Sequence, residues 1–328
     1  MARRALGLLL VTVAAVPWCF AAPDRAADLD SFKSDRGAQI SRLVRKGTPD
    51  SLAAAALLKQ FGEETDTGAY SLVARAVQLA PDRRDLAWLA IRLCASAPDC
   101  DPVNPEAHLR DIDPRNAVGF MGDLARSQRK NDVAGVDAAL TSIGQSERTY
   151  VYYNPLVVAT ATELLAAGHP VSQTSARIQT SQATVEMIGV IAASVLPPFQ
   201  SFSLSCKDLA LQAEGRLEKC RQAAKVFERA DTFLVEGAGL SLQQRLWPLD
   251  SAEGKAITAR RRTFQYRLEE YSRLDVSSFS LSEVPADLLK TMRGNAREQD
   301  TALVYFGRAK VPVEPPEGWT SNTLPRVP

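Results

Sequence analysis

The chain has 328 residues, of which 45% are hydrophobic and 23% charged, and its formal net charge is +1. This near balance lacks the excess of lysine and arginine that a dedicated nucleic-acid binder uses to displace counterions from phosphates. Nucleic acid is therefore not an expected partner, whereas the length and apolar content suffice for a substantial core in one or two domains.

The N-terminus has the layout of a secretory signal peptide. Two arginines precede an apolar run over residues 5–16, and Pro17 then leads to the small residues Ala21 and Ala22. The run is shorter than the roughly 20 residues that a membrane-spanning helix needs. We expect residues 1–21 to be cleaved off after Ala21, leaving a periplasmic or secreted protein without a stable membrane span. An uncleaved N-terminal membrane anchor is the alternative.

The sequence that follows predicts an all-α protein. Apolar residues recur at helical spacing, and runs of alternating β-branched and aromatic residues, which are typical of strands, are absent. Thr48 and Asn154 each precede a proline and an apolar run, as a capping residue does at a helix N-terminus. Four successive alanines at 53–56 indicate a tightly packed helix. We expect stacked antiparallel helical hairpins in an irregular, α-solenoid-like row.

Several stretches in the first half have an apolar face that we expect to be buried. Their residues lie three and four positions apart, as on one side of a helix. Trp88 stands among them and is expected in the core. The predicted buried stripes are Tyr70, Val73, Ala74 and Val77, and Leu86, Leu89, Ala90 and Leu93.

Two stretches of the first half share a pattern of a proline followed by an aromatic residue: "LAPDRRDLAWLAIRL" and "IDPRNAVGFMGDLAR". Their prolines, Pro81 and Pro114, are 33 residues apart, and an aromatic residue follows each, Trp88 and Phe120. The pattern is similar to the tetratricopeptide repeat, in which a helix ends at a proline and the next repeat opens with an aromatic residue. The resemblance covers about residues 48–168 and implies stacked helix pairs. The stretch from Arg129 likewise resembles that family's turn into a second helix, which implies that Val133, Val136 and Leu140 are packing positions. The resemblance assigns no peptide-binding residues.

Four cysteines remain once the signal peptide is removed: Cys94, Cys100, Cys206 and Cys220. An even number in an exported chain predicts two disulfides. No Cys-x-x-Cys motif occurs and the two histidines lack ligand spacing, so a zinc site or a catalytic dithiol is not expected. Of the three possible pairings, we favour the first with the second and the third with the fourth.

The second of these bridges sets a condition on the backbone. Fourteen residues of unbroken helix would separate Cys206 from Cys220 by about 21 Å, whereas a disulfide tolerates about 7 Å between Cα atoms. We therefore expect Cys206 in a loop or a separate short helix, with a break near Gly215.

One polar cluster lies between Cys100 and Cys206, in "EAHLRDID". Glu106, His108, Asp111 and Asp113 fall within eight residues, and His108 and Asp111 share a helical face. Such groups could hold a metal or perform acid–base chemistry, but a short charged helix would carry them as a solvated face, which we favour. Since phosphate-loop, nucleophile-elbow and H-E-x-x-H motifs are missing, we assign no catalytic, cofactor-binding or metal-binding residue. His169 is expected to interact with the last carbonyls of a helix.

The chain divides into a repeat-like region, residues 22–171, and a second helical region, residues 172–310. Residues 187–196 are the most apolar internal stretch; ten residues cannot cross a membrane, so a buried helix ending at Pro197 is expected. The proline-rich residues 311–328 predict an extended tail, pinned by Trp319.

Three successive arginines, residues 260–262, are predicted to belong to a solvated helix face, because their side chains point in three directions and acidic residues follow. The opposite face of this helix should be buried. Its expected buried stripe consists of Ile257, Phe264, Leu268 and Tyr271.

These observations favour an exported, non-enzymatic binding or scaffolding protein whose partner is a protein or peptide of the cell envelope. An exported hydrolase that uses carboxylates in an interhelical cleft is the alternative, and a purely structural envelope component is a third hypothesis. Carboxylates from distant segments that converge in a deep cleft would favour the enzyme, and a broad concavity would favour binding.

Overall fold

The computed structural model describes residues 25–60, 68–98, 100–167, 187–276 and 287–321. Within these ranges the chain is almost entirely helical, and its only β-type pairings are two isolated bridges. The predicted all-α class is therefore confirmed. The expected signal peptide and His169 lie outside the described residues.

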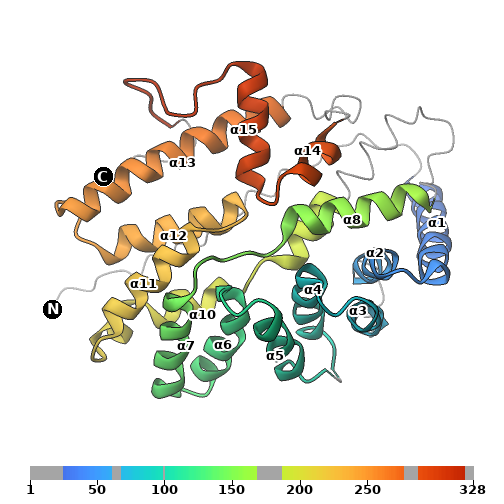
Figure 1. Ribbon diagram of the computed structural model, residues 1–328, viewed down its shortest axis with the longest axis horizontal. Coiled ribbons are helices and arrows are strands. Elements are labelled where there is room, and N and C mark those ends of the chain that lie inside the picture. Colours follow the sequence, from blue (N-terminus) through green and yellow to red (C-terminus); the bar gives the residue numbers. More distant parts are fainter. Residues whose placement is uncertain (1–24, 61–67, 99, 168–186, 277–286, 322–328) are drawn as a thin grey trace.

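The first half is a row of helices joined by short turns (Figure 1). Each helix packs against the next, so neighbours pair as hairpins, with the 3-10 helix η1 joining α5 to α6. Their bounds are α1 (Arg25–Lys46), α2 (Pro49–Gln60), α3 (Gly68–Leu79), α4 (Arg84–Cys94), α5 (Val103–Ile112), η1 (Ala117–Phe120), α6 (Met121–Arg129) and α7 (Val133–Gln145). A regular solenoid and the likeness to tetratricopeptide repeats stay predictions.

The second half extends this row and covers it. α8 crosses over α1, α2 and α4, helical residues 187–195 follow, and α11 packs on α7, α12 on α11 and α13 on α12 (Figure 1). The remaining helices lie against these, α14 on α8 and α15 on α13 and α14. The bounds are α8 (Tyr153–Ala166), α10 (Phe199–Ser205), η2 (Asp208–Gln212), α11 (Arg216–Glu228), α12 (Phe233–Leu246), α13 (Ala252–Val276), α14 (Leu288–Gly294) and α15 (Glu298–Ala309).

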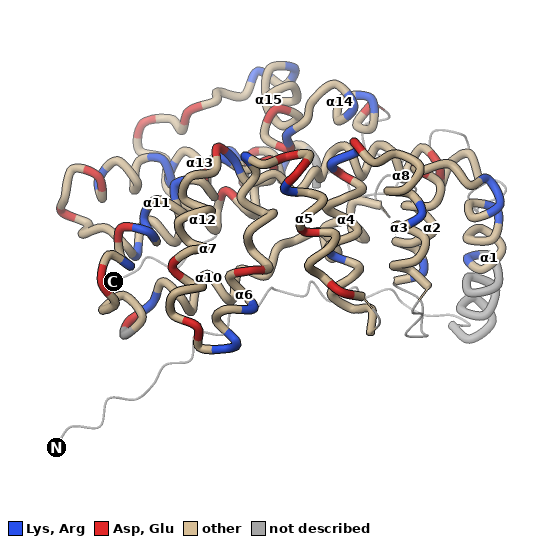
Figure 2. The backbone as a smooth tube through the Cα atoms, turned by 60° about the horizontal axis from the view of Figure 1, so that its bottom comes forward, with Lys and Arg blue, Asp and Glu red and all other residues tan. Residues whose placement is uncertain are grey.

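The core is one cluster of buried side chains that extends from Leu43 in α1 to Met292 in α14. It contains residues from both sides of position 172, the expected boundary between the two helical regions. Basic and acidic residues are interspersed along the described chain (Figure 2).

Two predicted helix starts behave differently. Thr48 caps α2 as expected, because its Oγ1 accepts a hydrogen bond from the backbone N–H of Ser51 at 3.2 Å. Asn154, however, does not cap α8, which already begins at Tyr153. The Asn154 side chain instead donates to the carbonyl of Asn295 at 2.9 Å and to Thr301 Oγ1 at 3.0 Å, and so ties α8 to the C-terminal helices.

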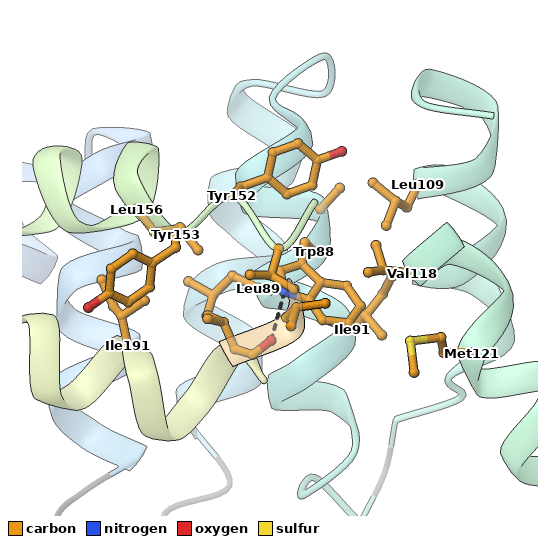
Figure 3. Packing of buried hydrophobic residues seen from close by; sticks show 14 of the residues in the cluster. Trp88, Leu89, Ile91, Leu109, Val118, Met121, Tyr152, Tyr153, Leu156 and Ile191 are labelled. Atoms are coloured by element: carbon orange, nitrogen blue, oxygen red, sulfur yellow. Dashed lines mark hydrogen bonds between the residues drawn. The ribbon is translucent and has the colours of Figure 1, made fainter. Parts of the chain in front are cut away.

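Most of the expected buried stripes are buried. The four alanines at 53–56 are fully buried, and the predicted stripe of α4 is at most 4% exposed. Trp88 is 1% exposed and donates its indole N–H to the carbonyl of Val195 at 3.1 Å, which fastens residues 187–195 to α4 (Figure 3). The prediction was wrong at Val133, which is 60% exposed because it starts α7 with its side chain facing solvent.

The buried face of α3 is rotated relative to the predicted stripe. Its buried residues are Ala69, Val73 and Ala76, whereas Tyr70 and Val77 are only partly buried. The periodicity predicted the helix correctly but not which face of it is buried. Small alanine side chains allow close packing on a neighbouring helix, so the buried face includes Ala69 and Ala76.

Among the described residues, one stretch, Met187–Ser205, has the length and composition of a possible membrane span, with a hydropathy of 1.5. Its helix is interrupted at Pro197, and α10 begins only at Phe199. Met187, Ile191 and Val195 are fully buried in the core. The helix thus ends before the prolines as predicted and buries one face, but only 33% of the apolar window is buried, so the expectation of a buried helix holds for that face alone.

Both predicted disulfides are present. Cys94 and Cys100 have Cα atoms 5.4 Å apart, and those of Cys206 and Cys220 are 5.7 Å apart. As required, Cys206 lies just after α10, and Gly215, with a φ of 68°, precedes α11. Two bridges in one chain are typical of an oxidising environment.

The C-terminal segment lies along α13. Arg262 donates to the carbonyl of Pro316 at 2.8 Å, and the Trp319 ring meets Tyr266 edge-on with centroids 5.4 Å apart. Arg260 forms an ion pair with Glu228 at 2.8 Å. The expected pinning by Trp319 is confirmed, but the expected solvated face is wrong for these two arginines, because α13 lies between α12 and the tail.

A buried carboxylate joins the two halves of the chain. Asp231, between α11 and α12, is fully buried and accepts hydrogen bonds from the backbone N–H of Val151 at 2.9 Å and of Tyr153 at 3.3 Å. Burial raises the pKa of Asp231 to about 6, although the backbone donors act in the opposite direction. The charged form of the Asp231 carboxylate is thus disfavoured in the folded protein.

This raised pKa predicts a stability that increases on acidification. Between the unfolded value near 4 and the folded value, the folded state binds the proton more readily, so the Asp231 contribution grows as pH falls. From pH 7 to pH 4.5 we expect a gain of about 2 kcal/mol in the free energy of unfolding relative to Asp231→Asn. Urea titrations of both proteins at the two pH values measure it, and parallel pH dependences would refute it.

Candidate functional site

The polar cluster singled out in the sequence is not one site. Glu106 is 3% exposed and forms a two-pronged ion pair with Arg126, with N–O distances of 2.8 and 2.5 Å. His108 donates through Nε2 to the carbonyl of Pro81 at 2.9 Å, and Asp111 is exposed. The expected solvated face is therefore wrong for Glu106, which packs against α6.

Asp113 belongs to a different network. It is 3% exposed, and its carboxylate pairs with Arg148 at 2.5 Å and accepts a hydrogen bond from the Tyr152 hydroxyl. Burial and the neighbouring carboxylate raise the pKa of Tyr152 above its ordinary value. Asn116 joins the network by donating to the Tyr152 oxygen at 2.9 Å. This carboxylate holds the turn before α8, so the solvated-face expectation is wrong here too.

No metal centre emerges from these groups. Across the described part of the chain, no three His, Cys, Asp or Glu side chains lie close enough to hold an ion. Three of the four candidates contact separate neighbours, and Asp111 is exposed, while α5 itself packs against α4 and η1.

An open apolar hollow lies instead along α12 and α13. We call it the α12–α13 groove and define it by Phe199, Phe233, Leu234, Phe264 and Leu268; its volume is about 590 Å³. A second hollow of about 230 Å³ shares three of these residues and continues the groove toward helical residues 187–195.

The groove exposes two leucines, one of which the sequence assigns to the core. Leu234 is 55% exposed and Leu268 is 38% exposed, whereas Ile257, from the same predicted stripe as Leu268, is fully buried. The predicted buried stripe of α13 is thus wrong at Leu268, which faces the groove. Large apolar side chains gathered on an open surface mark an interaction site more often than single ones do.

Aromatic rings form the floor of the groove. Gly237 permits this arrangement, because a Cβ at that position would lie 2.7 Å from the Phe264 ring. The Phe233 ring lies 6.1 Å from that of Phe264 and 5.6 Å from that of Tyr271, centroid to centroid. Rings in mutual contact provide a stiff apolar surface, which a ligand can cover at little entropic cost.

The groove also carries a positive charge. Arg261 lines it, has no ion pair or hydrogen bond with any described residue, and has a pKa that burial lowers from its ordinary value. The nearby Glu269 accepts a hydrogen bond from Ser321. The guanidinium of Arg261 can therefore receive a carboxylate from outside.

Sequence reasoning missed this site for a physical reason. A helix face that waits for a partner has the same 3.6-residue period as one that is buried within the chain. Only the packing around α13 reveals that Leu268 stays open. Comparisons with protein-family models, curated protein sequences and solved structures give no match to this chain.

Proposed function

We propose that this chain is an exported binding or scaffolding protein that holds an apolar segment of another envelope protein in the α12–α13 groove. The observation that carries the proposal is the exposure of Leu234 and Leu268 beside aromatic rings in a hollow of about 590 Å³. A cleft between two helices suits the apolar face of a third helix, which is a recurring mode of peptide recognition.

The positive charge of Arg261 in the groove restricts the kind of segment that can bind there. Since Arg261 forms no ion pair with a described residue, and the nearby Glu269 already accepts a hydrogen bond from Ser321, the bound segment should contribute an aspartate or glutamate to Arg261. We therefore propose an amphipathic helix whose apolar face covers Leu234 and Leu268 and whose carboxylate reaches Arg261.

The hydrolase alternative finds less support. It needs two carboxylates in one cleft with protons to exchange. The carboxylates that line the described pockets are already used: Glu106 pairs with Arg126, Glu269 accepts from Ser321, and Glu298 accepts from the backbone N–H of Phe233. Binding is thus the function that these contacts favour.

Export is part of the proposal. The two disulfides fit an oxidising compartment, as does the signal-like N-terminus, for which cleavage after Ala21 stays a prediction. An envelope partner follows from that location.

A photo-crosslinking residue at position 234 tests the proposal in cells. We expect an adduct with one envelope protein, and a synthetic peptide of the captured segment should bind the purified chain. Leu234→Glu should weaken that binding at least tenfold, because it places a charge on the apolar floor and beside the peptide's carboxylate. Isothermal titration calorimetry measures the change.

Val133 provides the matched control, since it is 60% exposed on α7, away from the groove. Val133→Glu should leave peptide affinity unchanged, and a crosslinker there should give no such adduct. Equal effects of the two glutamates, or adducts with lipid alone, would contradict the proposal.

A further inference from the structure

A third hollow lies between α4, α6 and α10. We call it the Arg92 pocket and define it by Trp88, Arg92, Met121, Ala125 and Leu204; its volume is about 580 Å³. The Cys94–Cys100 disulfide forms part of its wall. A volume of this size is typical of sites for small molecules.

The lining of the pocket is largely apolar. Trp88, Ile91, Val118 and Met121 come together from α4, η1 and α6, as Figure 3 shows. Leu204 of α10 is 47% exposed and lines the same hollow. Trp88, Val118 and Met121 are almost fully buried, so a ligand's apolar body would cover the exposed lining residues Pro198 and Leu204.

Arg92 provides the polar element. Its Nε donates to the carbonyl of Ser194 at 3.0 Å, and its guanidinium carbon lies 5.9 Å from the centre of the Trp88 ring. The two terminal nitrogens have no partner among the described residues, and no described carboxylate pairs with them. Burial lowers the pKa of Arg92, which reflects the cost of holding a cation there without a counter-charge.

The other charges do not neutralise Arg92. Glu106 is held by Arg126, which also pairs with Asp123 at 2.5 Å, so this group is satisfied internally. Arg129 also lines the pocket, is exposed, and has no ion pair with a described residue. The pocket therefore presents a fixed, anchored guanidinium next to an apolar wall, with a second cation near it.

From this geometry we propose that the Arg92 pocket binds a small amphiphilic carboxylate. Its carboxylate pairs with the two terminal nitrogens of Arg92, and its apolar body packs on Pro198 and Leu204. A guanidinium whose Nε is already fixed offers its outer edge to a planar carboxylate, which it can bind in two-pronged geometry. This site is separate from the α12–α13 groove and does not depend on the proposed function.

Three ligands with the same tail test the proposal on the purified full mature chain: decanoate, decanol and decylamine. We expect decanoate to bind about tenfold or more tightly than the other two, because only its head group can pair with Arg92. Isothermal titration calorimetry provides the affinities. Equal affinities for the three ligands, or no binding of decanoate, would overturn the proposal.

Arg92→Gln should remove this preference for decanoate. The matched control is Arg221→Gln, because Arg221 also donates to a main-chain carbonyl, that of Leu246 at 3.0 Å, and stacks on a tryptophan, Trp247, outside the pocket. Arg221→Gln should keep the preference. If both variants lose it, or neither does, the assignment to Arg92 is wrong.

A second pair of variants avoids any cost to folding. Leu204→Glu and Leu204→Gln have nearly the same shape at a half-exposed position, but only the first adds a negative charge. Decanoate should bind Leu204→Glu at least threefold more weakly than Leu204→Gln, because the added charge repels it. Leu234→Glu, in the other groove, should leave decanoate binding unchanged. Identical decanoate affinities of the two Leu204 variants would refute the proposed site.

Discussion

Replacement of Asp113 by alanine is expected to lower the free energy of unfolding by about 3–5 kcal/mol, the usual cost of removing one partner from a buried ion pair. The change would leave Arg148 with only the exposed Glu147, 3.8 Å away, as a counter-charge, and the Tyr152 hydroxyl without its acceptor. Both groups are mostly buried, so water replaces the carboxylate poorly. Urea denaturation of the purified protein measures the loss.

Asp111 is a control of the same residue type, two positions away. It is exposed, so Asp111→Ala should change the free energy of unfolding by less than about 0.5 kcal/mol. Similar losses in the two variants would mean that the Asp113 network does not stabilise the fold.

Removal of the Cys206–Cys220 bridge is expected to cost about 3 kcal/mol, since the bridge closes a loop of about 15 residues in the unfolded chain. The double variant Cys206→Ala with Cys220→Ala tests this by urea denaturation. The Cys94–Cys100 bridge closes a shorter loop, so its double alanine variant should lose less, about 2 kcal/mol.

Reduction provides an internal check on these bridges. A reductant should destabilise the native chain but have little further effect on a variant that lacks all four of these cysteines. If the native chain shows the same denaturation curve with and without reductant, the bridges do not stabilise it.

The all-α class and the two disulfides were predictable because they depend on interactions between residues that are close in the sequence. The Thr48 cap needs only its own turn, and the bridges follow from chain geometry and the break near Gly215. Asn154 shows the limit of this reasoning. Its side chain binds Thr301, a residue far away in the sequence, and this tertiary contact prevailed over the local capping pattern.

Burial of charged residues was not predictable in the same way. Glu106 and Asp113 look like members of a solvated face, since the sequence does not reveal that Arg126 and Arg148 approach them from other elements. The groove was missed for the converse reason. Leu268 carries the periodic signal of a core residue, and only the arrangement of neighbouring helices leaves it open.

The packing of α7 against α11 imposes an order on biosynthesis. A nascent polypeptide emerges N-terminus first, so Asp137 is made well before Arg216, the cation that it pairs with at 2.5 Å. Until α11 has been synthesised, the face of α7 that packs on it stays uncovered and can associate with other chains. A stop codon placed between the two helices should therefore leave this face of α7 uncovered and lower the solubility of the truncated product.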